Sequence, residues 1–396
     1  MVSRAASRTR VAIALALGLV AIGAACSSTS SGNFGTARNF VTRKPATFIG
    51  PLLSSDETPT ITLGRDGGIT VPLPNGKILW IFGDTPTYRY EAGAWKLTAF
   101  IEGSSAGLVS YTPGKRPTLP VDELAIGQQS TKATPAAQFL APPTVYLPDG
   151  SGKICNKENG GPTAGSVRWA TGAALLADRT NVFVPYIDAC VISALKHQPE
   201  GWGFAIYNWK TNRFTVPPTD VFVPKKSGEA ISSAQYFGSP IVSGHSVTMF
   251  SATCCKVGSS VYSTTLSTTL AALKNPKSYF PNPILGLPAT FLLTVAPPTV
   301  THPYLTMYKL TSVTGGYRIF SSSKPEGPWV DVAEGTLPKC ASSPAPCNNS
   351  IYLHPELSSP KELLASYWLP GYGPGIGRYP DKSRAIYHIV FASLPL

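Results

Sequence analysis

Apolar and polar positions alternate in short runs along this chain, and turn-forming residues separate the runs. Residues 68–73 and 77–82 flank Asn75-Gly76, the strongest short-range signal for a β-hairpin. Apolar residues at helical spacing are confined to short pieces such as 268–273. Paired runs recur further along, at 173–177 with 182–187, 204–209 with 213–216, 239–242 with 246–250, 305–310 with 317–321, and 363–368 with 385–392. The pattern predicts an all-β protein.

The predicted hairpins cover the whole length, and no change in composition marks a domain boundary. With 36 Gly, 38 Pro and only 14% charged residues, the composition also argues against a helical protein. Two β-sandwiches are the alternative, but they would need a linker near the middle, where the sequence has none. A radial array of small sheets fits better, with five blades of about 65 to 70 residues each. We therefore predict a single five-bladed β-propeller domain over residues 46–396.

The first residues have the pattern of an export signal. Three arginines precede an apolar run at 11–25, which is too short for a spanning helix. Small residues then lead to Cys26 and a Ser-rich stretch, which resembles the lipobox of bacterial lipoproteins. We predict a signal peptide at 1–25, a lipid-anchored tether at 26–45 with Cys26 acylated, and a protein held on the outer face of the cell membrane. Ordinary cleavage near Ala25 is the alternative.

The cysteine count agrees with export. Seven cysteines are present, and removing Cys26 leaves six, so three disulfides are expected. Cys340 and Cys347 are close enough in sequence to pair locally. Cys254 and Cys255 could bond to each other, but we favour a pairing of each with one of Cys155 and Cys190. The spacing of the cysteines matches no zinc knuckle, and we predict no metal site.

The charge is positive but dispersed. The formal net charge of +12 falls to +9 when the three arginines of the signal segment (Arg4, Arg8 and Arg10) are removed. Lys and Arg form no runs, so we expect no nucleic acid partner. An anionic envelope or polymer is a more plausible partner, although solubility alone would also explain the charge. No Gly-Lys-Ser/Thr phosphate loop and no His-Glu-x-x-His occurs, and we predict a monomer without a cofactor.

Two aspartates lie at the open ends of the first hairpin, in "GRDGG" and "FGDT". A two-residue turn would pair Pro74 with Lys77 and place Asp66 and Asp84 diagonally, with Cα atoms on the order of 5 to 8 Å apart. The aspartates would point to opposite faces unless a β-bulge at Gly67-Gly68 corrects the phase. Glycosidases use two carboxyl groups of this kind, one as acid and one as base or nucleophile. The alternative is that both aspartates only cap turns.

Other acids and aromatic residues could contact a substrate. Glu102 lies in "FIEGSSAG", another Gly- and Ser-rich stretch, and Glu356 lies in "IYLHPELSSP" beside Tyr352 and His354. A histidine near a carboxyl group can tune its pKa, although a His-Pro-Glu sequence is more often a surface turn. We predict substrate-binding roles for Arg65, Glu102, Tyr352, His354 and Glu356.

Three segments carry a family resemblance: "GRDGG…VPLPNGKILWIFGDT", "SSSKPEGPWV" and "SIYLHPELSSPKELLASYW". The first and the last resemble the opening and closing blades of a secreted actinobacterial family of endo-D-arabinanases, and the second is similar to blade ends of five-bladed propeller glycosidases. The resemblance implies a propeller with acids in a central funnel, and it carries catalytic roles over to Asp66 and Asp84. It also implies cleavage of D-arabinofuranose linkages in cell-wall arabinan, the polysaccharide of arabinogalactan or lipoarabinomannan.

Two other functions stay open. A catalytically silent propeller lipoprotein could bind wall polysaccharide without cleaving it, and "EGSSAGLVSY" stands where active relatives have an Asn-rich segment. The chain could also act on another furanoside, such as L-arabinan or fructan. Release of reducing ends from arabinogalactan distinguishes cleavage from binding.

Overall fold

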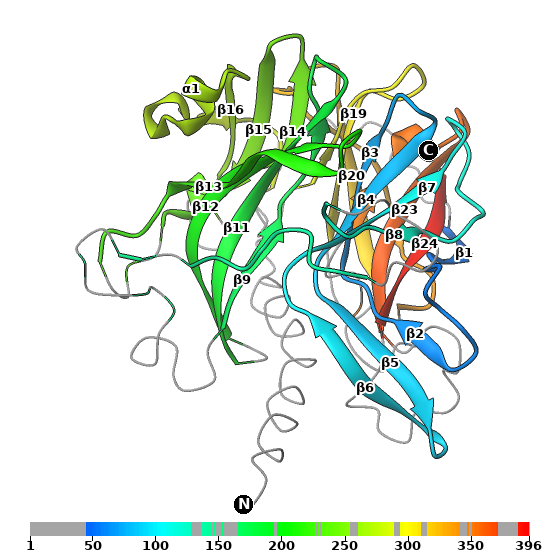
Figure 1. Cartoon of the computed structure of the whole chain (residues 1–396). Helices are drawn as coiled ribbons and strands as arrows, with labels where there is room; N and C mark the ends of the chain where they lie inside the picture. Colours follow the sequence, from blue (N-terminus) through cyan, green and yellow to red (C-terminus); the bar gives the residue numbers. More distant parts are fainter. Residues whose placement is uncertain are drawn as a thin grey trace, which may run out of the picture.

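The computed structural model describes residues 45–127, 136–144, 165–193, 196–226, 229, 231–253, 260–288, 294–309, 315–340, 351–370 and 387–395, and single residues between 146 and 155 and at 347. Strands dominate this part of the chain, and its α-helix is a single turn, α1 (Leu270–Lys274). Figure 1 shows the strands gathered into small sheets around a common centre.

Five antiparallel sheets of four or five strands follow one another along the described chain, and we call them blades 1 to 5. Blade 1 contains β3 (Gly67–Pro72), β4 (Lys77–Phe82), β7 (Ser105–Ser110) and β8 (Asp122–Glu123). Blade 2 contains β9 (Gly165–Ala170), β10 (Ala174–Leu175), β11 (Asn181–Ser193), β12 (Lys196–Asn208) and β13 (Arg213–Phe222).

The remaining blades have four strands each. Blade 3 contains β14 (Gly238–Ser243), β15 (Ser246–Ala252), β16 (Val261–Ser267) and β17 (Asn282–Ile284). Blade 4 contains β18 (Val295–Ala296), β19 (Tyr304–Lys309), β20 (Gly316–Ser322) and β21 (Val330–Thr336). Blade 5 combines both ends of the domain, β22 (Ile351–Leu353), β23 (Glu362–Pro370), β24 (Tyr387–Pro395) and β1 (Thr47–Pro51).

The inner strands of the blades close a circle. β3 contacts β10, β10 contacts β14, β14 contacts β18, β18 contacts β22, and β22 returns to β3. The antiparallel pairing of β1 with β24 joins the first strand to the last. The prediction of an all-β propeller is confirmed, and the described strands of this circle form five sheets.

The apolar core lies between neighbouring blades, which is why some strands are buried on both faces. All residues of β4 after Lys77 are buried. Ile69 and Leu79 of blade 1 pack in one cluster with Val182 and Tyr207 of blade 2, whereas Trp80 of blade 1 packs towards blade 5. Burial of such side chains stabilises a fold by about 1.5 to 3 kcal/mol each. The circle is therefore held by contacts that no single hairpin makes.

One further sheet lies outside the circle, and we call it the arm: β2 (Ile61–Leu63), β5 (Thr85–Glu91) and β6 (Ala94–Ile101). Its β5–β6 hairpin extends away from the blades (Figure 1). The arm is tied to blade 5, because Thr62 Oγ1 lies 3.1 Å from Nε2 of buried His388. The same hydroxyl donates to Glu57 Oε1 at 2.7 Å.

The first hairpin differs from the prediction by one residue. Three residues form the turn, Leu73 N donates to Lys77 O at 2.8 Å, and Pro72 pairs with Ile78. The predicted bulge is present, because the register shifts between Gly67 and Ile69. Gly68 has φ +133°, and a Cβ there would lie 2.9 Å from Ser366 Oγ of blade 5. A glycine therefore allows blades 1 and 5 to approach at this bulge.

Two disulfides lie in the described part, Cys155–Cys190 and Cys340–Cys347. The local pairing of Cys340 with Cys347 is confirmed. The expectation that Cys155 and Cys190 each pair with Cys254 or Cys255 is wrong, because Cys155 and Cys190 are bonded to each other, with Cα atoms 5.3 Å apart. Cys254 and Cys255 lie outside the described residues.

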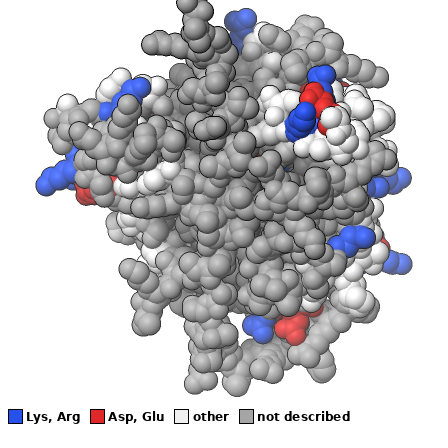
Figure 2. Space-filling view, turned by 90° about the horizontal axis from the view of Figure 1, so that it is seen from below, with Lys and Arg blue, Asp and Glu red and all other residues white. Residues whose placement is uncertain are grey.

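The predicted signal peptide, Cys26 and almost all of the tether also lie outside the described residues. Within the described part, no helix has the length and apolar character needed to cross a membrane. Figure 2 shows charged side chains of the described residues in small groups around the edge of the lower face. Among these residues, the view agrees with the dispersed charge of the sequence.

Candidate functional site

Three carboxyl groups lie where the strands of the arm connect to the rest of the chain. Asp66 directly precedes β3, Asp84 lies between β4 and β5, and Glu102 directly follows β6. Asp66 N donates to Asp84 O at 3.2 Å, and Gly83 N donates to Asp66 O at 2.6 Å. The bulge at Gly68 produces this alignment, since it brings Asp66 opposite Gly83. Asp66 and Asp84 therefore lie together at one end of blade 1, as the sequence predicted.

Asp84 is held by two donors on one oxygen. Its Oδ1 accepts from Gly103 N at 2.8 Å and from Trp169 Nε1 at 2.9 Å. The side chain is only 8% exposed. The pKa of Asp84 is raised to about 7, mainly by burial and also by the charges of Asp66 and Glu102, against the lowering effect of the two hydrogen bonds. Asp84 can therefore exist as a neutral acid near neutral pH.

Asp66 is 6% exposed, and its Oδ1 accepts from Gly67 N at 2.7 Å. Tyr352 of blade 5 lies within its electrostatic reach, because burial and then the charge of Asp66 raise the pKa of this tyrosine. Tyr352 is half-buried and packs against the core cluster that joins blades 1 and 2. The circle of blades thus brings the predicted Tyr352 near the predicted Asp66.

Glu102 is half-buried, and burial raises its pKa. Its backbone carbonyl accepts from Gln138 Nε2 at 2.7 Å. The next residue, Gly103, has φ +102°, and a Cβ there would lie 2.8 Å from Arg168 O. A glycine is therefore required where this loop presents its N–H to Asp84. The predicted Glu102 belongs to the same group of acids.

Arg65 lies elsewhere than predicted. It is 3% exposed, forms an ion pair with buried Glu123, and donates to Ser105 Oγ at 3.0 Å. Its guanidinium also stacks over the Phe82 ring at 4.2 Å. The structure does not bring Arg65 to a surface where it could contact a substrate. It joins strands of blade 1, because a buried cation requires such partners.

His354 and Glu356 also serve contacts between blades. His354 has no exposed surface, and its ring nitrogens lie 3.0 Å from Thr70 Oγ1 and 2.7 Å from Ser366 Oγ. Glu356 Oε1 accepts from Thr70 Oγ1 at 2.6 Å. These two residues connect blade 5 to the middle of β3, so the substrate-binding role predicted for His354 does not fit its complete burial. Glu356 accepts its hydrogen bond from Thr70, the threonine that also contacts His354.

Trp169 is the site residue that sequence reasoning missed. Its neighbour Arg168 binds Asp188 through Nε at 2.7 Å and Nη2 at 2.8 Å, and its Nη2 also reaches Asp220 at 3.2 Å. Ser104 Oγ donates to Arg168 O at 2.8 Å, which joins β9 to the loop of Glu102. The only sequence signal was a basic residue beside a tryptophan, which does not reveal a partner 85 positions away.

One described group has the spacing of metal ligands, Cys155, Cys190 and Glu200. Both sulfurs are already in a disulfide, so the group has no thiolate to offer a metal in this state.

Comparisons with known proteins show the fold. No family model matches the sequence, and no curated protein matches it significantly. A crystal structure described as a "putative hydrolase" from Bacteroides ovatus ATCC 8483 matches with a TM-score of 0.50 at 15% identity, over 88% of this chain and 93% of that one. At this identity the likeness shows a shared fold.

Two more distant structures are glycoside hydrolases. Zg3597, a family 117 glycoside hydrolase of Zobellia galactanivorans, has a TM-score of 0.47 and 10% identity, over 88% of this chain and 90% of that one. The GH43_1 enzyme of Xanthomonas citri complexed with xylotriose has a TM-score of 0.46 and 10% identity, over 88% of this chain and 91% of that one.

Proposed function

We propose that this chain is a glycoside hydrolase in which Asp66 and Asp84 form the catalytic pair. The observation that carries the proposal is the placement of two buried, electrostatically coupled carboxyl groups at one end of blade 1. The pKa of about 7 makes Asp84 a proton donor at neutral pH, as a glycosidase acid must be.

The two aspartates take different roles. Because Gly103 and Trp169 both donate to Oδ1, the proton of Asp84 resides on Oδ2. Asp84 gives this proton to the glycosidic oxygen as its bond to the anomeric carbon breaks. Asp66 then acts as the base that activates water, or attacks the anomeric carbon itself. Glu102 and Tyr352 contact the sugar beside the pair.

We further propose endo-cleavage of D-arabinofuranose linkages in cell-wall arabinan. The support is the resemblance of the segments around Asp66, Asp84 and Tyr352 to endo-D-arabinanases. A secreted protein acylated at Cys26 would act on this polymer from the outer face of the membrane. If Cys26→Ala leaves membrane fractionation unchanged, the anchoring proposal is wrong.

The test is hydrolysis of purified arabinogalactan by the wild type, Asp66→Asn and Asp84→Asn, measured as reducing ends and as released oligosaccharides. General acid–base assistance contributes about 10² to 10⁴ in rate, so either substitution should lower turnover by about that factor. Asp122→Asn, on outermost strand β8 of the same blade, is the matched control and should keep wild-type activity.

Two outcomes would change the conclusion. A fully active Asp66→Asn or Asp84→Asn would make that aspartate a turn residue. A wild type that binds arabinan but releases nothing would favour the silent lipoprotein, in which the acids only accept hydrogen bonds from sugar hydroxyls.

A further inference from the structure

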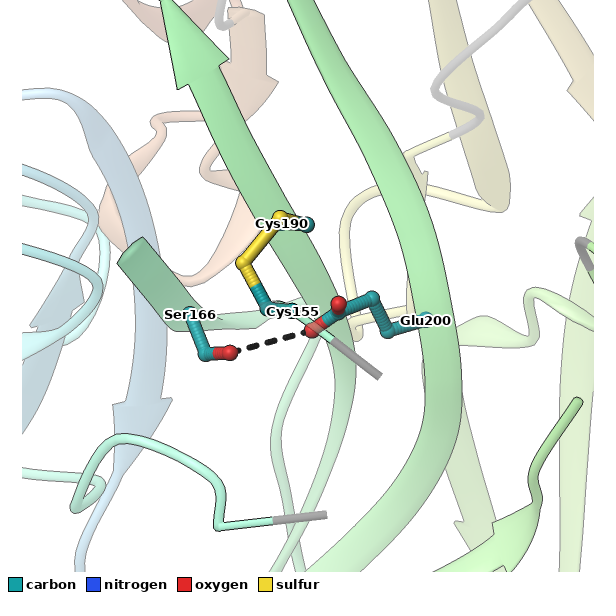
Figure 3. Close-up of a disulfide and its surroundings, with 4 residues drawn as sticks. All are labelled: Cys155, Ser166, Cys190 and Glu200. Carbon is teal, nitrogen blue, oxygen red and sulfur yellow. Dashed lines mark hydrogen bonds between the residues drawn. A yellow bond between two sulfur atoms is a disulfide. The ribbon is translucent and has the colours of Figure 1, made fainter. Parts of the chain in front are cut away.

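Blade 2 contains a buried acid that the proposed hydrolysis does not use. Glu200 of β12 is 1% exposed and lies beside the Cys155–Cys190 disulfide (Figure 3). One carboxyl oxygen is within 4.8 Å of both sulfurs. Oε2 accepts from Ser166 Oγ at 3.1 Å, whereas Oε1 has no hydrogen-bond partner among the described residues. A buried carboxylate oxygen without a partner is costly, so the arrangement needs a physical explanation.

The surroundings of Glu200 favour its neutral form. The pKa of Glu200 is raised to about 7, mainly by burial and also by the charge of Asp188 on β11, against the lowering effect of the Ser166 hydrogen bond. Asp188 is in turn bound by Arg168 of β9, which also reaches Asp220 of β13. A neutral Glu200 carries its proton on Oε1, because Ser166 already donates to Oε2.

The two sulfurs differ in accessibility. Cys190 is 3% exposed within β11, where it pairs with Ser166 on one side and Gln198 on the other. Cys155 is partly exposed. A thiolate that attacks the disulfide therefore reaches Cys155 and expels the sulfur of Cys190. A buried thiolate is unfavourable, so the expelled sulfur requires a proton.

We propose that the Cys155–Cys190 disulfide is a site of thiol–disulfide exchange, at which Glu200 donates the proton that the leaving sulfur of Cys190 takes up. The reductant is a dithiol. Its thiolate bonds to Cys155 Sγ, the Sγ–Sγ bond breaks, and the electron pair leaves on Cys190 Sγ, which takes the proton from Glu200 Oε1.

The second thiol of the reductant completes the exchange. It loses its proton to water and attacks the reductant sulfur of the mixed disulfide, so Cys155 leaves as a thiolate and takes a proton from water. The disulfide gains two electrons, the dithiol loses two, and Glu200 regains a proton from solvent.

The second described disulfide is an internal control. Cys340 and Cys347 are 3% and 0% exposed. Among the described residues, Glu200 is the acid that has an oxygen within 4.8 Å of both sulfurs of a disulfide, and that disulfide is Cys155–Cys190. Exchange at Cys340–Cys347 should therefore not depend on Glu200.

The test is reduction of the folded, full-length protein by dithiothreitol, with alkylation at timed intervals and mass spectrometry of the cysteine peptides. Each rate is divided by the concentration of reductant thiolate. For Cys155–Cys190 in the wild type, this corrected rate should fall above about pH 7, where Glu200 is ionised. Glu200→Gln should lower it about 10-fold or more at pH 6.5 and remove the pH dependence, whereas Glu200→Asp should retain part of both.

Several results would overturn the proposal. The rate for Cys155–Cys190 could be unchanged in Glu200→Gln, or the corrected wild-type rate could show no fall above pH 7. Glu200→Gln could slow both disulfides equally, or both could be reduced at the rate of global unfolding. The wild-type profile needs no variant, so the proposal can be tested even if Glu200→Gln does not fold.

Discussion

The hydrogen bond from Trp169 to Asp84 allows a test of the acid role through pH. The indole N–H stabilises the ionised form of Asp84, and Trp169→Phe removes this donor while keeping an aromatic ring. A hydrogen bond to a charged group contributes about 1.5 to 3 kcal/mol. Because 1.36 kcal/mol corresponds to one pKa unit, the pKa of Asp84 should rise from about 7 by roughly 1 to 2.

Asp84 donates a proton only below its pKa, so the wild type should lose activity as the pH rises through about 7. In Trp169→Phe this loss should occur at a pH higher by about 1 to 2. At pH 8 the protonated fraction of Asp84 would rise from about one tenth to about one half or more. The assay is kcat/KM for arabinan hydrolysis from pH 5 to 10, since this parameter reports the free enzyme.

Two variants make the assay specific. Trp209→Phe removes an indole that donates to Arg179 O at 3.0 Å in blade 2, and it should leave the pH profile unchanged. Glu102→Gln removes a charge that raises the pKa of Asp84, so its activity should be lost at a lower pH than in the wild type. If Trp169→Phe shifts the alkaline limb downwards or not at all while remaining folded, Asp84 is not the acid.

Further predictions concern stability and covalent structure. Folding raises the pKa of Asp84 from 3.8 to about 7, so the folded state loses roughly 4 kcal/mol of stability relative to the unfolded state between pH 4 and pH 8. In urea denaturation, Asp84→Asn should therefore be more stable than the wild type at pH 8 and similar to it at pH 4. Arg65→Met should cost about 3 to 5 kcal/mol because Glu123 loses its buried cation, with KM unchanged; a raised KM without loss of stability would return Arg65 to substrate binding. Thiol titration of the denatured, unreduced mature protein should find no free thiol, and more than one per chain would contradict three disulfides.

The local features of this protein were readable from consecutive residues. Alternation with period two and short polar turns predicted the hairpins, because strand pairing across a tight turn is decided by neighbours in sequence. The same logic predicted the bulge at Gly68 and the Cys340–Cys347 bond, whose cysteines are 7 positions apart. Asp66 and Asp84 could be placed together for this reason, although the turn proved one residue longer than expected.

Tertiary structure decided what those residues can do. Trp169 reaches Asp84 from blade 2 and Tyr352 approaches Asp66 from blade 5, because the circle of blades closes by side-chain packing that has no local period. Packing between blades 1 and 5 buries His354, and contacts within blade 1 bury Arg65, although the sequence had predicted that both bind substrate. The Cys155–Cys190 bond joins residues 35 positions apart. The raised pKa of Asp84 arises mainly from loss of water around the carboxyl group, and a carboxyl group loses that water only when distant segments of the chain pack over it.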